Sequence, residues 1–285
     1  MKENKSKHTV EKMCDTFQVS RSGYYDWQQR KHSKRQIETH QIKNEIQMIY
    51  KSSKNRYGSP KITKELTNRG WAISRPRVAR MMRSEGLRSI INKKYKCTTT
   101  DSNHSFSIAE NHLDRDFSAE RTGQKWVSDI TYIRTKQGWL YLTIVLDLFD
   151  RKVIGWALST TMTAKDTVVA AWRMAIKNRP TKGVLFHSDR GVQYACHEFR
   201  KELKPYQVIQ SMSRKGNCWD NAVAENFFKI IKSEMIYQVK YHSILQAKND
   251  VFEFIEIWYN RKRIHAYLGF NTPEEFGKIK YLKSA

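Results

Sequence analysis

Apolar residues recur every three or four positions through the first third of the chain, which is the spacing of helices with one buried face. Two short helices are predicted between residues 9 and 31, with Ser20 capping the second, and a longer helix follows. The apolar positions of the first and third helices are Val10, Met13, Cys14, Phe17, Ile37, Ile42, Ile46 and Ile49. The short pair has the rhythm of a helix-turn-helix, although any short helical hairpin would show the same pattern.

A second helical pair has clearer boundaries. PKITKELTNRG is predicted to be helical up to Gly70, and Ser74 followed by Pro76 marks the start of the helix RPRVARMMRSEG. The apolar positions of that helix are Val78, Met81 and Met82, and its basic positions are Arg75, Arg77, Arg80 and Arg83. The arginines lie where a recognition helix would meet DNA, and a solvated basic face is the alternative.

Strand patterns begin after Gln124. KWVSDITYIRT, WLYLTIVLDLF and RKVIGWALS are predicted to form an antiparallel meander. An α/β unit is completed by a helix from Thr163 to Asn178, the strand GVLFHSD, a helix around HEFRKEL, the strand YQVIQSMS and a helix from Ala222. The segment from Ile244 to Tyr259 is predicted to be a long amphipathic helix.

Changes of composition divide the chain into five segments. Residues 1–55 and 56–91 are the two helical units, and residues 92–123 form a polar, basic linker with clusters of Thr and Ser. Residues 124–240 form the α/β unit, and residues 241–285 form a helical extension that packs on it. The start of the linker, Lys93-Lys94-Tyr95-Lys96, could lie along DNA or be plain disordered chain.

The chain of 285 residues is strongly basic, since 52 Lys and Arg against 28 Asp and Glu give a formal net charge of +24. Such an excess indicates a polyanionic partner, because each neutralised phosphate releases condensed counterions, although ribosomal and membrane-surface proteins could share it. The sequence has neither a bilayer-length apolar run nor a signal peptide, so a cytoplasmic protein is expected. The scattered spacing of the cysteines argues against zinc and disulfides at Cys14, Cys97, Cys196 and Cys218.

Three acidic residues are candidates for chemistry. Asp129 lies within WVSDITYI, a segment of strand formers in which Asp is poorly suited. Asp189 ends a predicted buried strand, and Glu225 lies off the apolar stripe of its helix. Carboxylates converging from separate elements would suit a pair of Mg²⁺ ions, because hard cations take oxygen ligands. The alternative is three unrelated acids at element ends or in ion pairs.

Other polar residues near these acids have more ordinary interpretations. Asp220 or Asn221 is expected to cap the helix of Glu225, and Trp219 is expected to pack under it. One face of that helix carries Glu225, Lys229 and Lys232, an acid beside two cations that could also be a solvated ladder. His187 could orient a carboxylate or contact a phosphate, or it could satisfy local backbone groups. Surface turn acids with adjacent basic partners are predicted at Asp147 and Asp150.

The blocks WVSDITYI, HSDRGVQY and GNCWDNAVAENFFKIIKSE, with 35 residues between Asp189 and Glu225, resemble the Asp-Asp-Glu signature of insertion-sequence transposases in the retroviral-integrase superfamily. They are most similar to the second-reading-frame (OrfB) proteins of the insertion-sequence family that uses this spacing. NHLDRDFSAERTGQKWVSDITYI and WYNRKRIHAYLGFNTPEEF are similar to the flanking blocks of that family, so the resemblance spans nearly the whole chain.

The resemblance implies an α/β, RNase H-like catalytic core with a mixed five-stranded sheet, preceded by an all-α helix-turn-helix DNA-binding region. In that fold the first and fourth strands are neighbours, which would place Asp129 beside Asp189. The implied activity is strand cleavage and strand transfer of double-stranded DNA at terminal inverted repeats, with two Mg²⁺ ions, or Mn²⁺, held by Asp129, Asp189 and Glu225. The residues expected to contact DNA are Lys232, Lys229, Arg190, Arg75, Arg77, Arg80, Arg83, Arg261 and Arg263.

The resemblance also implies a homo-oligomer acting on paired repeats, with the product of an upstream frame (OrfA) as a partner or a frameshift fusion. Two other classes stay open. Another RNase H-like nuclease, such as a junction resolvase, would share the acids but would not be expected to carry Lys232 or the basic helices. A DNA-binding regulator without catalysis would use only residues 1–91.

Overall fold

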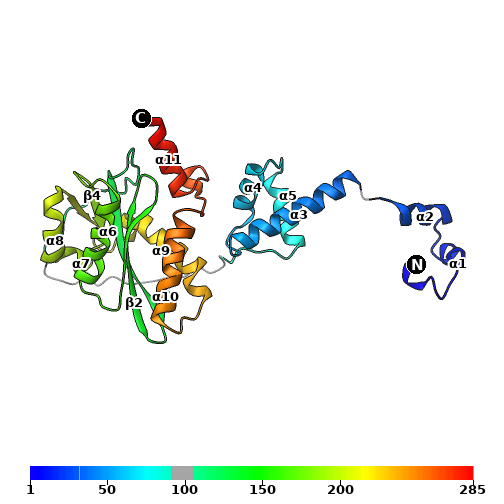
Figure 1. Cartoon of the computed structure of the whole chain (residues 1–285), viewed down its shortest axis with the longest axis horizontal. Helices are drawn as coiled ribbons and strands as arrows, with labels where there is room; N and C mark the ends of the chain where they lie inside the picture. Colours follow the sequence, from blue (N-terminus) through cyan, green and yellow to red (C-terminus); the bar gives the residue numbers. More distant parts are fainter. Residues whose placement is uncertain (32, 91–105, 285) are drawn as a thin grey trace. The chain divides into compact units, whose positions relative to one another are not determined.

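The computed structural model describes residues 1–31, 33–90 and 106–284 (Figure 1). The chain divides into two compact units, Met1–Arg88 and Ser89–Ala285. The basic start of the predicted linker, Lys93 to Lys96, lies outside the described residues. Within the described part of the chain, no helix has the length and hydropathy that crossing a membrane requires.

The first unit consists of helices. After a 3₁₀ turn at Lys2–Asn4, α1 spans Val10–Thr16, α2 spans Arg21–Gln29, α3 spans Lys34–Ser52, α4 spans Ser59–Asn68 and α5 spans Arg75–Ser84. Ser20 caps α2 as predicted, because its hydroxyl accepts a hydrogen bond from the backbone N–H of Gly23 (3.1 Å). Helices α3, α4 and α5 pack on one another. The buried apolar residues of these three helices include Ile42, Ile46, Ile49, Ile62, Leu66 and Val78.

The second unit is built on one mixed sheet. Its strands are β1 (Lys125–Thr135), β2 (Gly138–Asp147), β3 (Val153–Ser159), β4 (Leu185–Ser188) and β5 (Ile209–Met212), in the order β3-β2-β1-β4-β5. Strands β1 to β3 form the predicted antiparallel meander, and β4 and β5 run parallel to β1. The predicted adjacency of the first and fourth strands is therefore confirmed.

Helices cover both faces of the sheet (Figure 1). α6 (Ala170–Asn178), α7 (Val192–Ala195) and α8 (His197–Leu203) lie on one side, and α9 (Ala222–Glu234) and α10 (Ile244–Phe252) lie on the other. The core under α6 to α8 is rich in fully buried aromatic residues, namely Trp126, Trp172, Phe186, Tyr194 and Phe199. α6 approaches β3 so closely that a Cβ on Gly155 would lie 2.3 Å from the carbonyl oxygen of Ala171, so only glycine fits there.

The C-terminal extension is anchored on this unit. α10 continues as a π-helical segment, Glu253–Tyr259, and a 3₁₀ turn at Ala266–Leu268 leads to α11 (Pro273–Ser284). The side-chain amide of Asn260 donates to the carbonyl oxygen of Val153 (2.9 Å) and accepts from its N–H (3.0 Å), as a neighbouring strand would. A π-helical segment, Lys165–Val169, leads into α6, and 3₁₀ turns lie at Lys204–Tyr206, Cys218–Asn221 and Ile236–Gln238.

Residues 106–123, predicted as part of a linker, pack on the sheet instead. The backbone N–H groups of His112 and Leu113 donate to the Ser211 hydroxyl on β5 (3.0 and 3.2 Å), and Leu113 is buried. Phe106 and Ile108 pack against the aromatic core. The linker prediction is wrong for these residues because isolated apolar anchors and polar contacts fix the segment without leaving a periodic pattern.

Candidate active site

Asp129 lies on β1, and Asp189 follows directly after the end of the neighbouring parallel strand β4. The ladder between β1 and β4 pairs Val127 with His187, and each acid lies two residues beyond that pair. Because side chains alternate along a strand, Asp129 projects from the same face as Val127, and Asp189 continues the face of His187.

That face is the one that α9 covers. Trp126 and Phe186, each one residue before the paired positions, belong to the core under α6 to α8, so the acids face the opposite side of the sheet. α9 packs against β1 on that side and carries Glu225 in its first turn. The fold therefore brings the three predicted acids, from three separate elements, to one region.

The three carboxylates affect one another's protonation. Burial raises the pKa of Asp129 well above its ordinary value, the charge of Asp189 raises it further, and Glu225 adds a smaller contribution. The pKa of Glu225 is also raised, first by burial and then by Asp189. Such repulsion acts only between charges at short range, so the three side chains form one electrostatic cluster.

The chemistry of this cluster suits a hard cation. The Asp129 carboxylate accepts a hydrogen bond from the N–H of Ile130 (2.8 Å), and that of Asp189 accepts from the N–H of Gly191 (2.9 Å). As the described residues stand, no three His, Cys, Asp or Glu side chains form a closed group around a metal position. The charges of Asp189 and Glu225 nevertheless raise the pKa of Asp129, which a divalent cation would offset, and oxygen is the ligand that Mg²⁺ prefers.

Lys232 lies beside the cluster. Its side chain is almost buried, its Nζ lies 5.5 Å from the centroid of the Tyr132 ring, and its charge lowers the pKa of Asp129. Lys229, three residues earlier on α9, is exposed. Lys229 and Lys232 therefore do not share one face of α9 as predicted, since Lys232 faces β1 and Lys229 faces solvent. Contact of either lysine with DNA stays a prediction.

The start of α9 is held differently from the prediction. Asn221 occupies the N-cap position, but its side-chain amide donates to the carbonyl oxygen of Ser128 (3.0 Å), so it caps nothing. The buried carboxylate of Asp220 accepts from the guanidinium groups of Arg214 (2.9 Å from Nε) and Arg115 (2.9 Å from Nε). These contacts tie the first residues of α9 to β1 and to the segment before it.

Asp150 lies in a turn as predicted and Asp147 is the last residue of β2, but the prediction that they are surface acids is wrong. Both are buried, and burial, helped by the charge of Asp150, raises the pKa of Asp147 to about 6. Asp147 accepts from the backbone N–H of Gly123 (2.9 Å) and from the indole of Trp126 (3.3 Å). Asp150 forms an ion pair with Arg179, a partner distant in sequence, instead of its basic neighbours. Local sequence could not indicate these partners.

His187 is buried and fully engaged. Its Nδ1 lies 2.8 Å from the hydroxyl of Ser211, and its Nε2 lies 3.2 Å from that of Ser213. Burial lowers its pKa to about 4, so the ring is neutral at physiological pH. The partners are not the local backbone groups that the sequence suggested, because both are side-chain hydroxyls on or just after β5. A phosphate contact would require the ring to leave both serines.

The basic residues predicted to contact DNA differ in exposure. On α5, Arg75, Arg80 and Arg83 are exposed, whereas Arg77 forms an ion pair with Glu38 (3.1 Å). Near the acids, Nε of Arg190 donates to the carbonyl oxygen of Ser213 (2.7 Å).

The two C-terminal arginines, Arg261 and Arg263, also differ in exposure. Arg261 is largely exposed, with Glu274 3.6 Å away. Arg263 is buried in an ion pair with Glu234 (2.9 Å), so it cannot meet a phosphate without breaking that pair. We therefore remove Arg263 from the set of predicted DNA contacts.

Three notable residues escaped the sequence prediction. Trp219, expected to pack, is 69% exposed. Arg115 and Arg214 were not singled out, because their partner Asp220 is 105 and 6 residues away and leaves no local pattern. The sequence could have suggested these two arginines only through the position of Asp220, an acid directly before a helix that needs basic partners.

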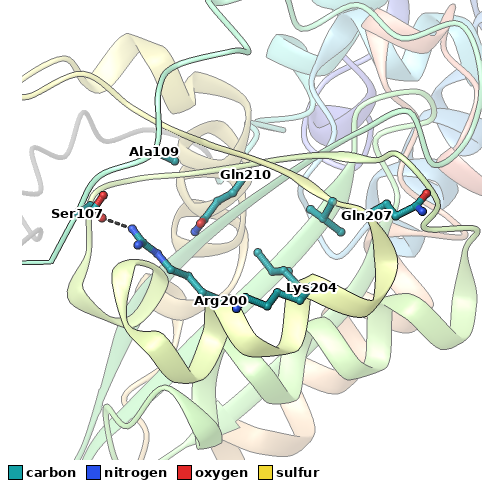
Figure 2. Close-up of a pocket in the computed structure, with 8 residues that line it drawn as sticks. Ser107, Ala109, Arg200, Lys204, Gln207 and Gln210 are labelled. Carbon is teal, nitrogen blue, oxygen red and sulfur yellow. Dashed lines mark hydrogen bonds between the residues drawn. The ribbon is translucent and has the colours of Figure 1, made fainter.

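A separate surface cleft of about 360 Å³ lies between the segment after residue 105 and the α8–β5 edge (Figure 2). Arg200, whose guanidinium donates to the carbonyl oxygen of Ser107, spans it. Its described lining is Ser107, Ala109, Arg200, Leu203, Lys204, Gln207, Val208 and Gln210. Since these residues include no carboxylate, the cleft offers no acidic ligand for a metal ion, unlike the acid cluster.

Family models match most of the chain. An integrase core domain model matches residues 119–218, a second integrase core domain model matches residues 225–280, and an HTH-like domain model matches residues 37–95. Asp129 and Asp189 fall within the first match, and Glu225 begins the second. The HTH-like match covers α3 to α5, so a helix-turn-helix role for α1 and α2 stays a prediction.

Individual proteins agree with these models. Transposase InsF for insertion sequence IS3A of Escherichia coli (strain K12) is 38% identical over 282 residues, which is 97% of this chain and 96% of that protein. A 31 kDa protein of insertion element IS600 from Shigella sonnei is 36% identical over 273 residues, 96% of this chain and 100% of that protein. The HTLV-2 integrase catalytic core domain in complex with magnesium aligns over 55% of this chain and 97% of that one, with 18% identity and a TM-score of 0.42, too weak a likeness to support a conclusion. The chain belongs to the InsF family of transposases of IS3-type insertion sequences.

Proposed function

We propose that Asp129, Asp189 and Glu225 are the catalytic residues of this transposase and that they support cleavage and joining of DNA strands at the ends of the mobile element. The observation that carries the proposal is the electrostatic cluster, in which the charges of Asp189 and Glu225 raise the pKa of Asp129 and the charge of Asp189 raises that of Glu225. Such an arrangement destabilises the folded chain by itself, and perturbed acids of this kind concentrate at functional sites.

The three carboxylates would hold two Mg²⁺ ions, with Mn²⁺ as a substitute, because their oxygens are hard ligands and the repulsion that raises the pKa of Asp129 and Glu225 would be relieved by divalent cations. When bound, the ions would supply the positive charge that activates an attacking oxygen and stabilises the leaving oxygen of an in-line displacement at phosphorus. The hydrogen bonds from the N–H groups of Ile130 and Gly191 support this role, since they orient the two aspartates before any ligand arrives.

Lys232 would hold a phosphate oxygen beside the acids. Its ammonium lies in the electrostatic range of Asp129 and is almost buried, so its attraction for a phosphate is screened less than that of a surface lysine. The same site would first hydrolyse one strand at the end of the element and then join the freed 3′-hydroxyl to a target phosphodiester. No covalent intermediate with the protein is required for either step.

The DNA itself would be held by exposed basic residues of both units. Arg75, Arg80 and Arg83 would contact phosphates from α5, with Arg77 joining them on release from Glu38. In the catalytic unit the corresponding exposed residues would be Lys229 and Arg261, and the half-buried Arg190, whose Nε donates to Ser213, would join them. The net charge of +24 supports phosphate contacts from both units, because a basic chain binds any polyanion. Recognition of the DNA sequence would then depend on a few contacts to bases.

We further propose that the protein acts as a homo-oligomer on paired inverted repeats, with an OrfA product as a partner or frameshift fusion. Both element ends must reach one target for joining, which two active sites accomplish together. Because the substrate is bacterial DNA, we expect the protein to act in the cytoplasm at the nucleoid.

The test replaces each acid with its amide. A labelled duplex carrying the inverted repeat from the DNA that flanks the gene is scored for complex formation by gel shift and for nicked or joined product on a denaturing gel. Asp129→Asn, Asp189→Asn and Glu225→Gln should each lower product formation by at least about a hundredfold while binding persists. Glu120→Gln, which removes an exposed carboxylate from the same unit, is the control and should leave both signals unchanged.

Three outcomes would count against the proposal. Cleavage at the wild-type rate by any of the three variants would remove that residue from the catalytic set. A wild-type protein that binds the duplex but forms no product in the presence of Mg²⁺ would leave the chain as a DNA-binding regulator of transposition. Full activity of the wild type in EDTA would exclude metal-assisted chemistry.

A further inference from the structure

Trp219 stands out among the tryptophans of the catalytic unit. It is 69% exposed, whereas Trp126 and Trp172 are fully buried. Within the described residues its indole makes no ring contact or hydrogen bond. An exposed indole presents a large, flat apolar surface that a ligand can cover.

The loop that carries Trp219 is held firmly. The next residue, Asp220, is fully buried and accepts hydrogen bonds from the N–H of Arg214 (2.9 Å), from the guanidinium groups of Arg214 (2.8 Å from Nη2) and Arg115 (2.9 Å), and from the amide of Asn111 (3.2 Å). Arginine pairs strengthen this anchor, because both partners of the bond are charged. The exposure of Trp219 is therefore a property of an anchored loop.

The anchor also places Trp219 at the acid cluster. Two residues after it, the amide of Asn221 donates to the carbonyl oxygen of Ser128 (3.0 Å), the residue that precedes Asp129. Glu225 lies in the first turn of the helix that begins directly after this loop. The backbone around Trp219 is thus bonded to the strand of one catalytic acid and leads into the helix of another.

The surroundings identify the class of ligand. The side chain of Arg214 is 48% exposed, Lys215 is exposed, and the other loop residues, 216 and 217, are Gly and Asn. A protein partner would need a continuous apolar patch, which a single indole among polar residues does not provide. A flat aromatic ring among cations instead matches single-stranded nucleic acid, whose bases stack while its phosphates pair with the basic side chains.

We propose that Trp219 stacks on an unpaired nucleobase next to the scissile phosphodiester, and so holds the strand end open over the acids. This proposal rests on the proposed function, because the site it serves is the acid cluster. Stacking would separate the terminal bases from their complements and expose the phosphodiester that the acids must reach. Trp219 would then be a positioning residue that contacts DNA and takes no part in bond breaking.

The experiment measures stacking without cleavage. Asp189→Asn protein in EDTA is mixed with a forked DNA duplex whose unpaired arm carries 2-aminopurine, a base whose fluorescence is quenched by stacking. Trp219 should quench the probe, Trp219→Ala should abolish quenching and weaken binding to the fork by roughly 5- to 150-fold, and Trp219→Phe should restore part of both. Trp139→Ala, which removes a tryptophan that is 46% exposed on β2, is the matched control and should change neither signal.

A second measurement needs no variant at Trp219. In the same protein, an abasic site in the unpaired arm should weaken binding as much as Trp219→Ala does, whereas an abasic site in the paired region should have little effect. Equal quenching by Trp219→Ala and its parent, or indifference to the abasic arm, would overturn the stacking proposal. Neither readout depends on cleavage, so the catalytic proposal can fail while stacking stands, and the reverse.

Discussion

The carboxylate of Glu234 and the guanidinium of Arg263 form a buried ion pair that joins the end of α9 to the segment after the C-terminal π-helix. Oε1 of Glu234 lies 2.9 Å from Nη2 and 3.0 Å from Nε of Arg263. The indole of Trp258 donates to the other oxygen (3.0 Å). The helix that carries Glu225 is therefore fixed at its C-terminal end by the extension, as it is fixed at its N-terminal end by Asp220.

This pair predicts a large loss of stability in Arg263→Ala. The variant leaves the buried Glu234 carboxylate without its guanidinium partner, and breaking a buried pair on one side costs about 3–5 kcal/mol. Arg261→Ala removes a side chain that is 64% exposed and should change the free energy of unfolding by less than about 0.5 kcal/mol. Urea denaturation followed by circular dichroism measures both values. Equal stability of the two variants would show that the pair is unimportant.

The acid cluster predicts that Asp129→Asn stabilises the metal-free protein at neutral pH. The pKa of Asp129 is raised in the folded state, so folded chains bind more protons than unfolded ones between the two pKa values, and stability falls as pH rises through the folded pKa. The side-chain amide of Asp129→Asn carries no charge, so this variant does not lose stability as the pH rises. The advantage should disappear at low pH, where the wild-type carboxyl is protonated.

Thermal melting in EDTA across a pH series measures this advantage. Adding Mg²⁺ should raise the melting temperature of the wild type by mass action and that of Asp129→Asn by less. Glu120→Gln again serves as the control, since its exposed side chain lies on no predicted metal site. A variant that melts below the wild type in EDTA at neutral pH would contradict the repulsion on which the site is argued.

The contribution of Asp220 to folding stability should depend on pH in the opposite sense to that of Asp129. The hydrogen bonds from Arg214, followed by those from Arg115, hold the pKa of Asp220 below its usual range. Its stabilising contribution is therefore present above the ordinary carboxyl pKa of about 3.9 and is lost as pH falls below it. Asp220→Asn should cost about 3 kcal/mol at pH 7, because an amide cannot accept from so many donors, and the cost should shrink toward pH 3. Asp114→Asn, which removes an exposed partner of Arg214, should cost far less.

The sequence indicated those parts of the structure that rest on local patterns. Alternation and apolar runs gave the meander and the strand ending at Ser188, and helical spacing gave α4, α5 and α9. The acids followed from strand ends and from the resemblance, because Asp is unfavourable within a strand such as β1. The sequence could not predict buried ion pairs between residues far apart in the chain, such as those of Asp150 and Arg263. Each of these residues lies 29 positions from its partner, and such a pair leaves no periodic signal.

The same limit explains the two errors of placement at the site. Asn221 and Asp220 have the composition of helix caps, yet their side chains bond to Ser128 and to Arg115, residues that only the folded sheet brings near. Trp219 was assigned to packing because tryptophan is usually buried. The anchored loop overrides that tendency, and nothing in the neighbouring residues reveals it.

The arginines of α5 predict the salt dependence of DNA binding. Each phosphate contact contributes about 0.9 to the slope of log K against log salt concentration, so Arg75→Ala, Arg80→Ala and Arg83→Ala together should flatten the slope by up to about 2.7. Arg77→Ala alone should change the slope little, because the guanidinium that it removes is paired with Glu38 in the wild type. Fluorescence anisotropy of a labelled duplex over a salt series measures the slope. An unchanged slope in the triple variant would make this helix face a solvated surface.

Lys232 and Lys229 predict two separable effects on one helix. Lys232 is almost buried and acts on Asp129, whereas Lys229 is exposed, so only Lys232→Ala removes a positive charge from the acid cluster. That variant should lose about 1–4 kcal/mol of DNA binding, the attraction of one cation for a phosphate at short range. It should bind Mg²⁺ at least as tightly as the wild type, because the cation that repels the metal has gone. Lys229→Ala should weaken DNA binding only slightly and leave Mg²⁺ affinity unchanged. Gel shift and calorimetric titration of Mg²⁺ report the two quantities, and a Lys232→Ala protein that binds DNA normally but loses Mg²⁺ would reverse the role assigned to this lysine.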